Sequence, residues 1–271
     1  MGKSKSENNN FEKVIVIIAC VLLVGVLAVV VAIRFSIVNK EDESDRLLST
    51  EELISVNSPM TAEEAFSLNG VSLHNLPILE FSGEPWVEVN GGMPFYIAAD
   101  IPSTGLERYD ALDELGRCGT VYACIGSETM PTEERGEIGH IKPSGWNQAK
   151  YFGVVNSKPP YLYNRCHLIA YCLTGENANE MNLITGTRYM NVEGMLPWEI
   201  KVANYVDETN NHVMYRVTPD FRGDELLARG VLIEAYSIED KGQGICFCVY
   251  CYNVQPGVVI DYMTGESWLE E

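Results

Sequence analysis

Asn164-Arg165-Cys166-His167 is the stretch from which we infer the fold and the chemistry of this chain. It sets one imidazole beside one cation, and the polar residues Asn182, Asn191 and Glu199 follow it closely. An imidazole with a pKa near 6.5 is largely neutral at pH 7 and can take a proton from water. Amide and carboxylate oxygens are the ligands that hard divalent cations prefer. The set therefore predicts a water-activating base beside a divalent cation, which suits hydrolysis of a phosphodiester.

Each polar residue of this set also has an ordinary structural role. His167 is expected to act as the general base, although an isolated histidine is more often packed in a core. Arg165 and Arg188 could neutralise the charge of a phosphate, and Asn182 could orient the site or contact substrate. Since single residues carry little weight, these roles depend on the whole set occurring together.

Asn191 and Glu199 are the candidates for a metal site. The side-chain carbonyl oxygen of Asn191 could bind Mg²⁺, which keeps several waters and needs few protein ligands, and Mn²⁺ is an alternative ion. Glu199 falls in the first turn of a helix predicted to begin at Pro197, where its carboxylate could hold a metal-bound water. The ordinary alternatives are a turn residue for Asn191 and a solvated helix face for Glu199.

The pattern of apolar residues beyond these stretches predicts an α+β domain. Short runs typical of strands alternate with turns that contain glycine or asparagine. One clear helix is predicted over residues 197–205, because Ile200, Ala203 and Val206 recur at helical spacing. The expected strands are residues 86–89, 95–98, 121–125, 151–155, 212–218, 230–237 and 244–254, with a further β-like segment at 161–163.

Taken together, these residues resemble the DNA/RNA non-specific endonuclease family, whose active site is a ββα-metal motif. The family signature Asp-Arg-Gly-His reads Asn164-Arg165-Cys166-His167 here, and residues 182–191 (NLITGTRYMN) are similar to the segment bearing the metal-binding asparagine. The resemblance covers roughly residues 86–267. Further segments resemble membrane-anchored DNA-entry nucleases: 142–146 (KPSGW), 194–199 (GMLPWE), 212–219 (HVMYRVTP), 228–231 (ARGV) and 252–257 (YNVQPG).

The resemblance implies a sugar-nonspecific endonuclease with a central antiparallel sheet and a helix that carries site residues. His167 would deprotonate a water that attacks phosphorus in line. An Mg²⁺ ion held by Asn191 would stabilise the departing 3′ oxygen, so the products would carry 5′-phosphates. DNA is the expected substrate, RNA is expected as well, and no small-molecule cofactor is implied.

Two residues depart from the family signature. Asn164 replaces the usual aspartate, which removes a negative charge near the site, and we place it with Arg188 among the expected substrate contacts. Cys166 replaces glycine and adds a thiol beside the base, which could be redox-sensitive or paired with Cys172. We expect activity to survive both departures.

The N-terminal region predicts a membrane anchor. Residues 14–33 form a run without a charged side chain, and about 20 such residues span a bilayer. Lys3, Lys5 and Lys13 precede the run, which places the N-terminus in the cytoplasm and exports the rest. A cleaved signal peptide, releasing a secreted protein, is the alternative, although the run is longer than a usual signal core. The expected parts are a cytoplasmic segment 1–13, a single transmembrane helix 14–33, an acidic extracellular stalk 34–85 and a nuclease domain 86–271.

The formal net charge of −19 argues against a nucleic-acid-binding protein. Such proteins are usually basic, because phosphate contacts dominate their affinity. The charge can be reconciled with a nuclease if the cations gather in one groove. The alternatives are a surface nucleic-acid-binding or uptake component that has lost catalysis, and a structural surface domain. The joint presence of His167, Asn191 and Glu199 favours an active enzyme; the oligomeric state is not predicted.

Of the eight cysteines, all but Cys20 lie beyond the predicted span, where export permits disulfides. The apolar run 245–252 contains three of them, at positions 246, 248 and 251. Zinc could bind there, but a strand points these thiols to different faces, so buried small apolar residues are the favoured interpretation. Two pairs are close enough in sequence to bond: Cys118 with Cys124, and Cys166 with Cys172.

Overall fold

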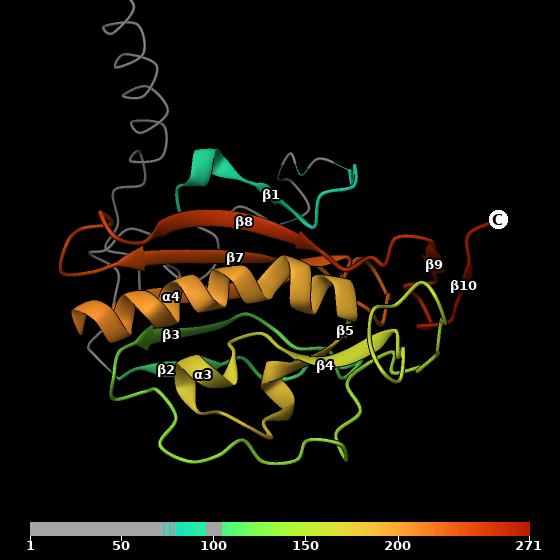
Figure 1. Cartoon of the computed structure of the whole chain (residues 1–271), viewed down its shortest axis with the longest axis horizontal. Helices are drawn as coiled ribbons and strands as arrows, with labels where there is room; N and C mark the ends of the chain where they lie inside the picture. Colours follow the sequence, from blue (N-terminus) through green and yellow to red (C-terminus); the bar gives the residue numbers. More distant parts are fainter. Residues whose placement is uncertain (1–72, 74–75, 77, 79, 96–104) are drawn as a thin grey trace, which may run out of the picture. The chain divides into compact units, whose positions relative to one another are not determined.

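The computed structural model describes residues 73, 76, 78, 80–95 and 105–271, and Figure 1 shows how their elements are arranged. The chain divides into two units, Met1–Pro59 and Met60–Glu271, and every described residue belongs to the second. The predicted membrane span 14–33 lies outside the described residues. Within the part of the chain that is described, no helix combines the length and the apolar character needed to cross a bilayer.

A six-stranded antiparallel sheet lies at the centre of the domain, as predicted. The strand order is β1-β8-β7-β6-β3-β2, and every neighbouring pair is antiparallel. The strands predicted to begin near residues 86, 121, 212, 230 and 244 are confirmed. The bounds are β1 Trp86–Glu88, β2 Glu107–Tyr109, β3 Val121–Ile125, β6 Val213–Pro219, β7 Gly230–Ser237 and β8 Cys246–Tyr252.

A second, two-stranded pair and one long helix carry the predicted site residues. β4 (Tyr163–His167) pairs antiparallel with β5 (Leu183–Thr187), so the 164–167 motif itself lies on a strand. The predicted helix is confirmed as α4 (Leu196–Thr209), and a π-helical stretch, η5 (Met190–Met195), leads into it. The remaining elements are α3 Tyr171–Thr174, η2 Asn90–Gly92, η4 Glu180–Asn182, β9 Val258–Ile260 and β10 Ser267–Leu269.

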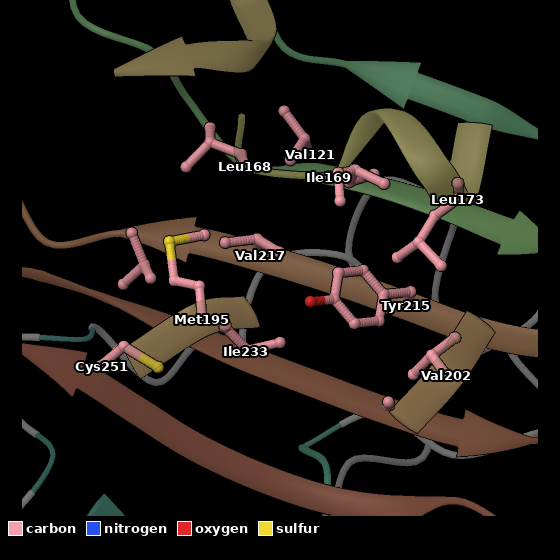
Figure 2. Close-up of a cluster of buried hydrophobic side chains, with 14 of the residues drawn as sticks. Val121, Leu168, Ile169, Leu173, Met195, Val202, Tyr215, Val217, Ile233 and Cys251 are labelled. Carbon is pink, nitrogen blue, oxygen red and sulfur yellow. The ribbon is translucent and has the colours of Figure 1, made fainter. Parts of the chain in front are cut away.

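The main core lies between one face of the sheet and the elements that carry the site. Figure 2 shows Leu168, Ile169 and Leu173, which follow β4, facing side chains of the sheet such as Tyr215 and Val217. α4 packs against the same face, as Figure 1 shows for the ribbon. Because alternate strand residues point to opposite faces, the other face has a second cluster that includes Leu232 and Tyr250 and is covered by Leu73 and Phe81.

The strand predicted over residues 151–155 is wrong. The N–H groups of Val154 and Val155 both donate to the carbonyl oxygen of Tyr151, at 3.3 and 3.1 Å, which closes a turn. Gly153 has φ +80°, a conformation that a strand does not adopt. The apolar residues here reflect burial, since Val155 packs in a satellite cluster with Leu162. Of the strand predicted at 95–98, residues 96–98 lie outside the described part.

Candidate active site

A cleft of about 810 Å³ lies where the β4–β5 pair meets η5 and α4. β4 presents its residues to this cleft beside β5, with His167 opposite Leu183 in the strand register. The chain then runs from β5 through η5 into α4, so side chains of β4, η5 and α4 line one space. The predicted site residues that line the cleft are Asn164, Arg165, His167, Arg188, Asn191 and Glu199.

His167 is held as a neutral imidazole. Its side chain is only 6% exposed, and its Nε2 lies 2.8 Å from the carbonyl oxygen of Asn177. Since a carbonyl can only accept, Nε2 carries the proton and Nδ1 keeps its lone pair. Burial lowers the pKa of His167, the guanidinium of Arg135 lowers it further, and the Asn177 carbonyl opposes both. At neutral pH the imidazole is therefore uncharged and able to accept a proton at Nδ1.

Arg135 is a site residue that the sequence did not identify. Its Nη2 donates to Nδ1 of His167 at 3.3 Å, and its charge also lowers the pKa of Glu199. In the sequence it follows Glu133 and Glu134, a run of charge that is typical of a solvated loop. Only the path of the loop in space brings this guanidinium into the cleft.

Asn191 and Glu199 lie on one continuous helical segment. In an uninterrupted α-helix, eight residues would turn Glu199 about 80° away from Asn191 around the axis. The N–H of Leu196 instead donates to the carbonyl oxygen of Asn191, an i→i+5 bond of the wider π type. Wider turns rotate less per residue, so this stretch brings the two side chains closer to one side of the helix, where both line the cleft.

The two side chains offer unengaged oxygen donors. Neither Asn191 nor Glu199 has a side-chain hydrogen bond to any described residue, although Glu199 is only 7% exposed. Burial raises the pKa of Glu199 to about 8, against the opposing effect of Arg135. A bound cation would favour the ionised form of this carboxyl group, and together with the free amide oxygen of Asn191 it fits a hard, hydrated ion such as Mg²⁺. The described residues contain no cluster of three His, Cys, Asp or Glu side chains that could enclose a metal, so a site with few protein ligands is what they allow.

Arg165 is largely engaged within the protein. Its Nε donates to the carbonyl oxygen of Ile141, its Nη2 donates to that of Gly139 at 2.7 Å, and its guanidinium stacks 4.1 Å from the Trp146 ring centroid. These contacts fasten the loop around residues 139–146 to the cleft wall. Of its nitrogen groups, only Nη1 has no hydrogen-bond partner among the described residues. Only this group is therefore available for the predicted phosphate contact.

Asn182 lies outside the cleft. Its side chain is 0% exposed; its Oδ1 accepts from the Ile169 N–H at 2.9 Å and its Nδ2 donates to the Ile169 carbonyl at 3.0 Å. A fully buried side chain cannot touch a substrate, so that part of the expectation is wrong. The paired bonds instead fix the backbone two residues beyond His167, which is an orienting contact.

No cysteine bonds to another among the described residues, so neither suggested disulfide is present. Cys166 points into the core, fully buried against Gly186 and Met190, and burial raises the pKa of its thiol. A thiol held protonated and away from solvent is poorly suited to a redox role. In β8, Cys248 and Cys251 belong to the clusters on opposite faces of the sheet, which confirms the interpretation as buried apolar residues for these two, whereas Cys246 is half-buried.

The acidic charge of the chain is not spread over the cleft. Arg135, Arg165 and Arg188 line it, against the single carboxylate of Glu199. A second cleft of about 670 Å³ is lined by acidic side chains instead, including Glu107, Glu128, Glu133 and Glu134. The cleft lining is therefore locally basic, although the chain as a whole has a net charge of −19.

The chain is similar to known nucleases. A family model for DNA/RNA non-specific endonucleases matches residues 99–239. A deoxyribonuclease from Streptococcus dysgalactiae subsp. equisimilis is 34% identical over 110 residues, which make up 39% of this chain and 32% of that protein. The chain thus matches about a third of the length of this relative.

Solved structures are also similar. NucA from Streptococcus agalactiae with a magnesium ion bound has a TM-score of 0.62 and 26% identity, over 73% of this chain and 94% of NucA. The same protein with no metal bound has a TM-score of 0.61 and 26% identity, over 80% of this chain and 99% of NucA. The Sda1 nuclease with a bound zinc ion has a TM-score of 0.53 and 29% identity, over 62% of this chain and 83% of Sda1. The described domain shares its fold with these proteins.

Proposed function

This chain belongs to the DNA/RNA non-specific endonuclease family, and we propose that its cleft hydrolyses phosphodiester bonds of DNA and RNA with His167 as general base and one bound Mg²⁺ ion. The family and the deoxyribonuclease relative support hydrolysis of DNA. The observation that carries the mechanism is the lone pair on Nδ1 of a buried, neutral His167 in the same cleft as the free oxygens of Asn191 and Glu199.

His167 removes the proton from the attacking water. The Asn177 carbonyl holds the ring through Nε2 and favours the protonated imidazole that forms, while burial keeps the resting ring neutral. Arg135 donates to Nδ1 without substrate, and in the complex its guanidinium turns to the phosphate oxygens and leaves Nδ1 to the water. Arg188 and Asn164, which line the same cleft, contact the neighbouring backbone.

Asn191 would hold the metal through its amide oxygen, and Glu199 would orient the waters around it. Bound Mg²⁺ supplies positive charge at phosphorus and at the leaving 3′ oxygen, so the products carry 5′-phosphates. Mn²⁺ has the same ligand preferences and would substitute. The magnesium bound to NucA supports this choice of ion.

We place the enzyme at the cell surface, acting outside the cell. The support is the charge-free run 14–33, preceded by lysines and followed by acidic residues, which predicts a single span with the nuclease domain exported. Cleavage after this run would give a secreted enzyme with the same site.

A plasmid-nicking assay with the full-length chain, with Mg²⁺ and with EDTA, tests the proposal. His167→Ala should lower the rate about 10²- to 10⁴-fold, the usual contribution of a general base. His140→Ala is the matched control, because His140 is exposed and does not line the cleft. Nicking by His167→Ala at the wild-type rate would exclude the mechanism. Binding of DNA without any nicking by wild type would favour the alternative, a surface nucleic-acid-binding component.

A further inference from the structure

The cleft contains an aromatic ring that the chemistry above does not use. Tyr161 lines it and its side chain is 39% exposed. Single exposed apolar residues are ordinary on protein surfaces, but this one faces the cleft that also holds His167. The Nζ of Lys150 lies 4.8 Å from the centroid of the Tyr161 ring, so an aromatic surface and a cation occur together.

The backbone holds this ring in a fixed place. Lys150 and Tyr161 form an antiparallel bridge, and on either side of it Tyr151 N–H donates to the Pro160 carbonyl at 3.1 Å and Leu162 N–H to the Ala149 carbonyl at 3.0 Å. Leu162 is fully buried beneath the bridge. A ring that is already ordered loses little conformational entropy when a ligand stacks on it.

Cations for a polynucleotide backbone lie close to the ring. Arg188 donates from its backbone N–H to the Leu162 carbonyl at 2.8 Å and from Nε to the Asn156 carbonyl at 3.2 Å. The Nε bond holds the side chain and leaves both Nη groups without a partner among the described residues. Lys150 is exposed. A positive groove with an aromatic platform is the combination by which proteins bind single-stranded nucleic acids.

The strand geometry relates the ring to the reacting centre. Tyr161, Tyr163, Arg165 and His167 alternate along one extended stretch, and all of them line the cleft. Since a strand rises about 3.3 Å per residue, Tyr161 lies at most about 20 Å from His167 along the chain. A base stacked on Tyr161 therefore belongs to a nucleotide a few positions from the phosphate that His167 serves.

We propose that Tyr161, flanked by Lys150 and Arg188, is a base-stacking subsite that holds one unpaired nucleotide a few positions from the scissile phosphate. This inference rests on the proposed nuclease function and specifies its substrate. A base inside a duplex has both faces covered by its neighbours, so it must leave the stack to reach the ring. The enzyme consequently prefers single-stranded or frayed nucleic acid to intact duplex.

An abasic scan tests the subsite. A single-stranded oligonucleotide with one abasic position, moved step by step, is cut by the full-length chain in Mg²⁺ under single-turnover conditions, and its affinity is measured in EDTA by fluorescence anisotropy. We expect one position, a few nucleotides from the cut, at which loss of the base lowers rate or affinity about 5- to 150-fold. Tyr161→Leu should lower the cleavage rate or affinity for the intact oligonucleotide by the same factor. Its rate and affinity should then not change with the place of the abasic position. Tyr161→Phe keeps the ring and should keep that dependence.

Trp268→Leu is the control, because Trp268 is a 51% exposed aromatic residue that does not line the cleft. The subsite proposal would be overturned if the oligonucleotide is cut but no abasic position changes the rate or the affinity. It would also be overturned if Tyr161→Leu keeps the wild-type dependence on the abasic position. Either result would leave the nuclease proposal intact. If no substrate is cut in Mg²⁺, the nuclease proposal fails, and the affinities in EDTA still decide whether a base stacks on Tyr161.

Discussion

Arg135 donates from Nη2 to Nδ1 of His167 at 3.3 Å, across 32 residues of sequence. The bond occupies the one lone pair through which His167 can act as a base. It also places a guanidinium where a phosphate must come to be attacked. Arg135 lowers the pKa of His167, and in the proposed mechanism it would also neutralise the phosphate.

Replacing Arg135 by glutamine should change both properties. We expect kcat/KM to fall about 10²- to 10³-fold, the usual loss for one donor to a developing oxyanion. The acid limb of its pH profile should also move to higher pH, because Arg135 lowers the pKa of His167. Lys142→Gln, an exposed residue of the same loop that does not line the cleft, is the control. A variant with wild-type kcat/KM and an unmoved acid limb would remove Arg135 from the site.

The lowered pKa of His167 also predicts how stability depends on pH. Below about pH 6.5 the unfolded chain binds a proton at this histidine that the folded chain resists, so folding stability falls as the pH falls. His212 has the opposite sign: Glu239 and Glu128 raise its pKa, so its stabilisation is present below about pH 6.5 and lost as the pH rises through the raised value.

Urea unfolding at about pH 7.5 and about pH 5.5 separates the two histidines. His167→Gln should reduce the loss of stability on acidification, and His212→Gln should increase it. Equal pH dependence in wild type and His167→Gln would show that burial does not hold His167 neutral in the folded state.

The sheet and the chemical set were predictable because their signals are local. Runs of apolar residues 121–125 and 230–237 are buried on both faces, so they are recognisable as strands in any context. His167 and Asn191 could be proposed as site residues because their residue types and the segments around them resemble a family motif. The sequence could supply these identities, and the structure then brought them to one cleft.

The remaining features depend on packing between distant segments. Arg135 lies in a loop whose local pattern is that of a solvated surface. Asn182 is polar, like a site residue. The structure shows that it is 0% exposed and that its side chain bonds to the backbone of Ile169. At 151–155 the short apolar run predicted a strand, whereas a turn that buries Val155 has the same composition. In each case the outcome depends on tertiary contacts with residues far away in the sequence, which a short stretch of sequence does not reveal.

The thiols should differ in reactivity according to their place in the fold. Cys172 lines the cleft and is half-buried, Cys246 is half-buried elsewhere, and the other described cysteines are buried. Burial raises the pKa of Cys172 and Cys246, so both should react slowly at neutral pH and faster at about pH 9. Alkylation should block the cleft and abolish nicking in wild type and in Cys246→Ser, whereas Cys172→Ser should keep its activity after treatment. Inactivation of Cys172→Ser at the wild-type rate would show that another thiol is responsible.

Cys166, where the family has glycine, leaves no room for a side chain at Gly186, which lies two residues beyond its register partner Ile184 on β5. A Cβ added at Gly186 would lie 2.4 Å from Cys166 Sγ and 2.5 Å from Met190 Cε. Met190 can turn its terminal methyl away, but the short Cys166 side chain cannot, so Gly186→Ala should cost about 1–3 kcal/mol of stability. Adding Cys166→Ala should recover part of this loss, with a coupling of about 1 kcal/mol in urea unfolding. Gly139→Ala, where a Cβ meets nothing within 4 Å, should be neutral. Additive effects of the two substitutions would mean that the thiol is not what excludes a side chain at position 186.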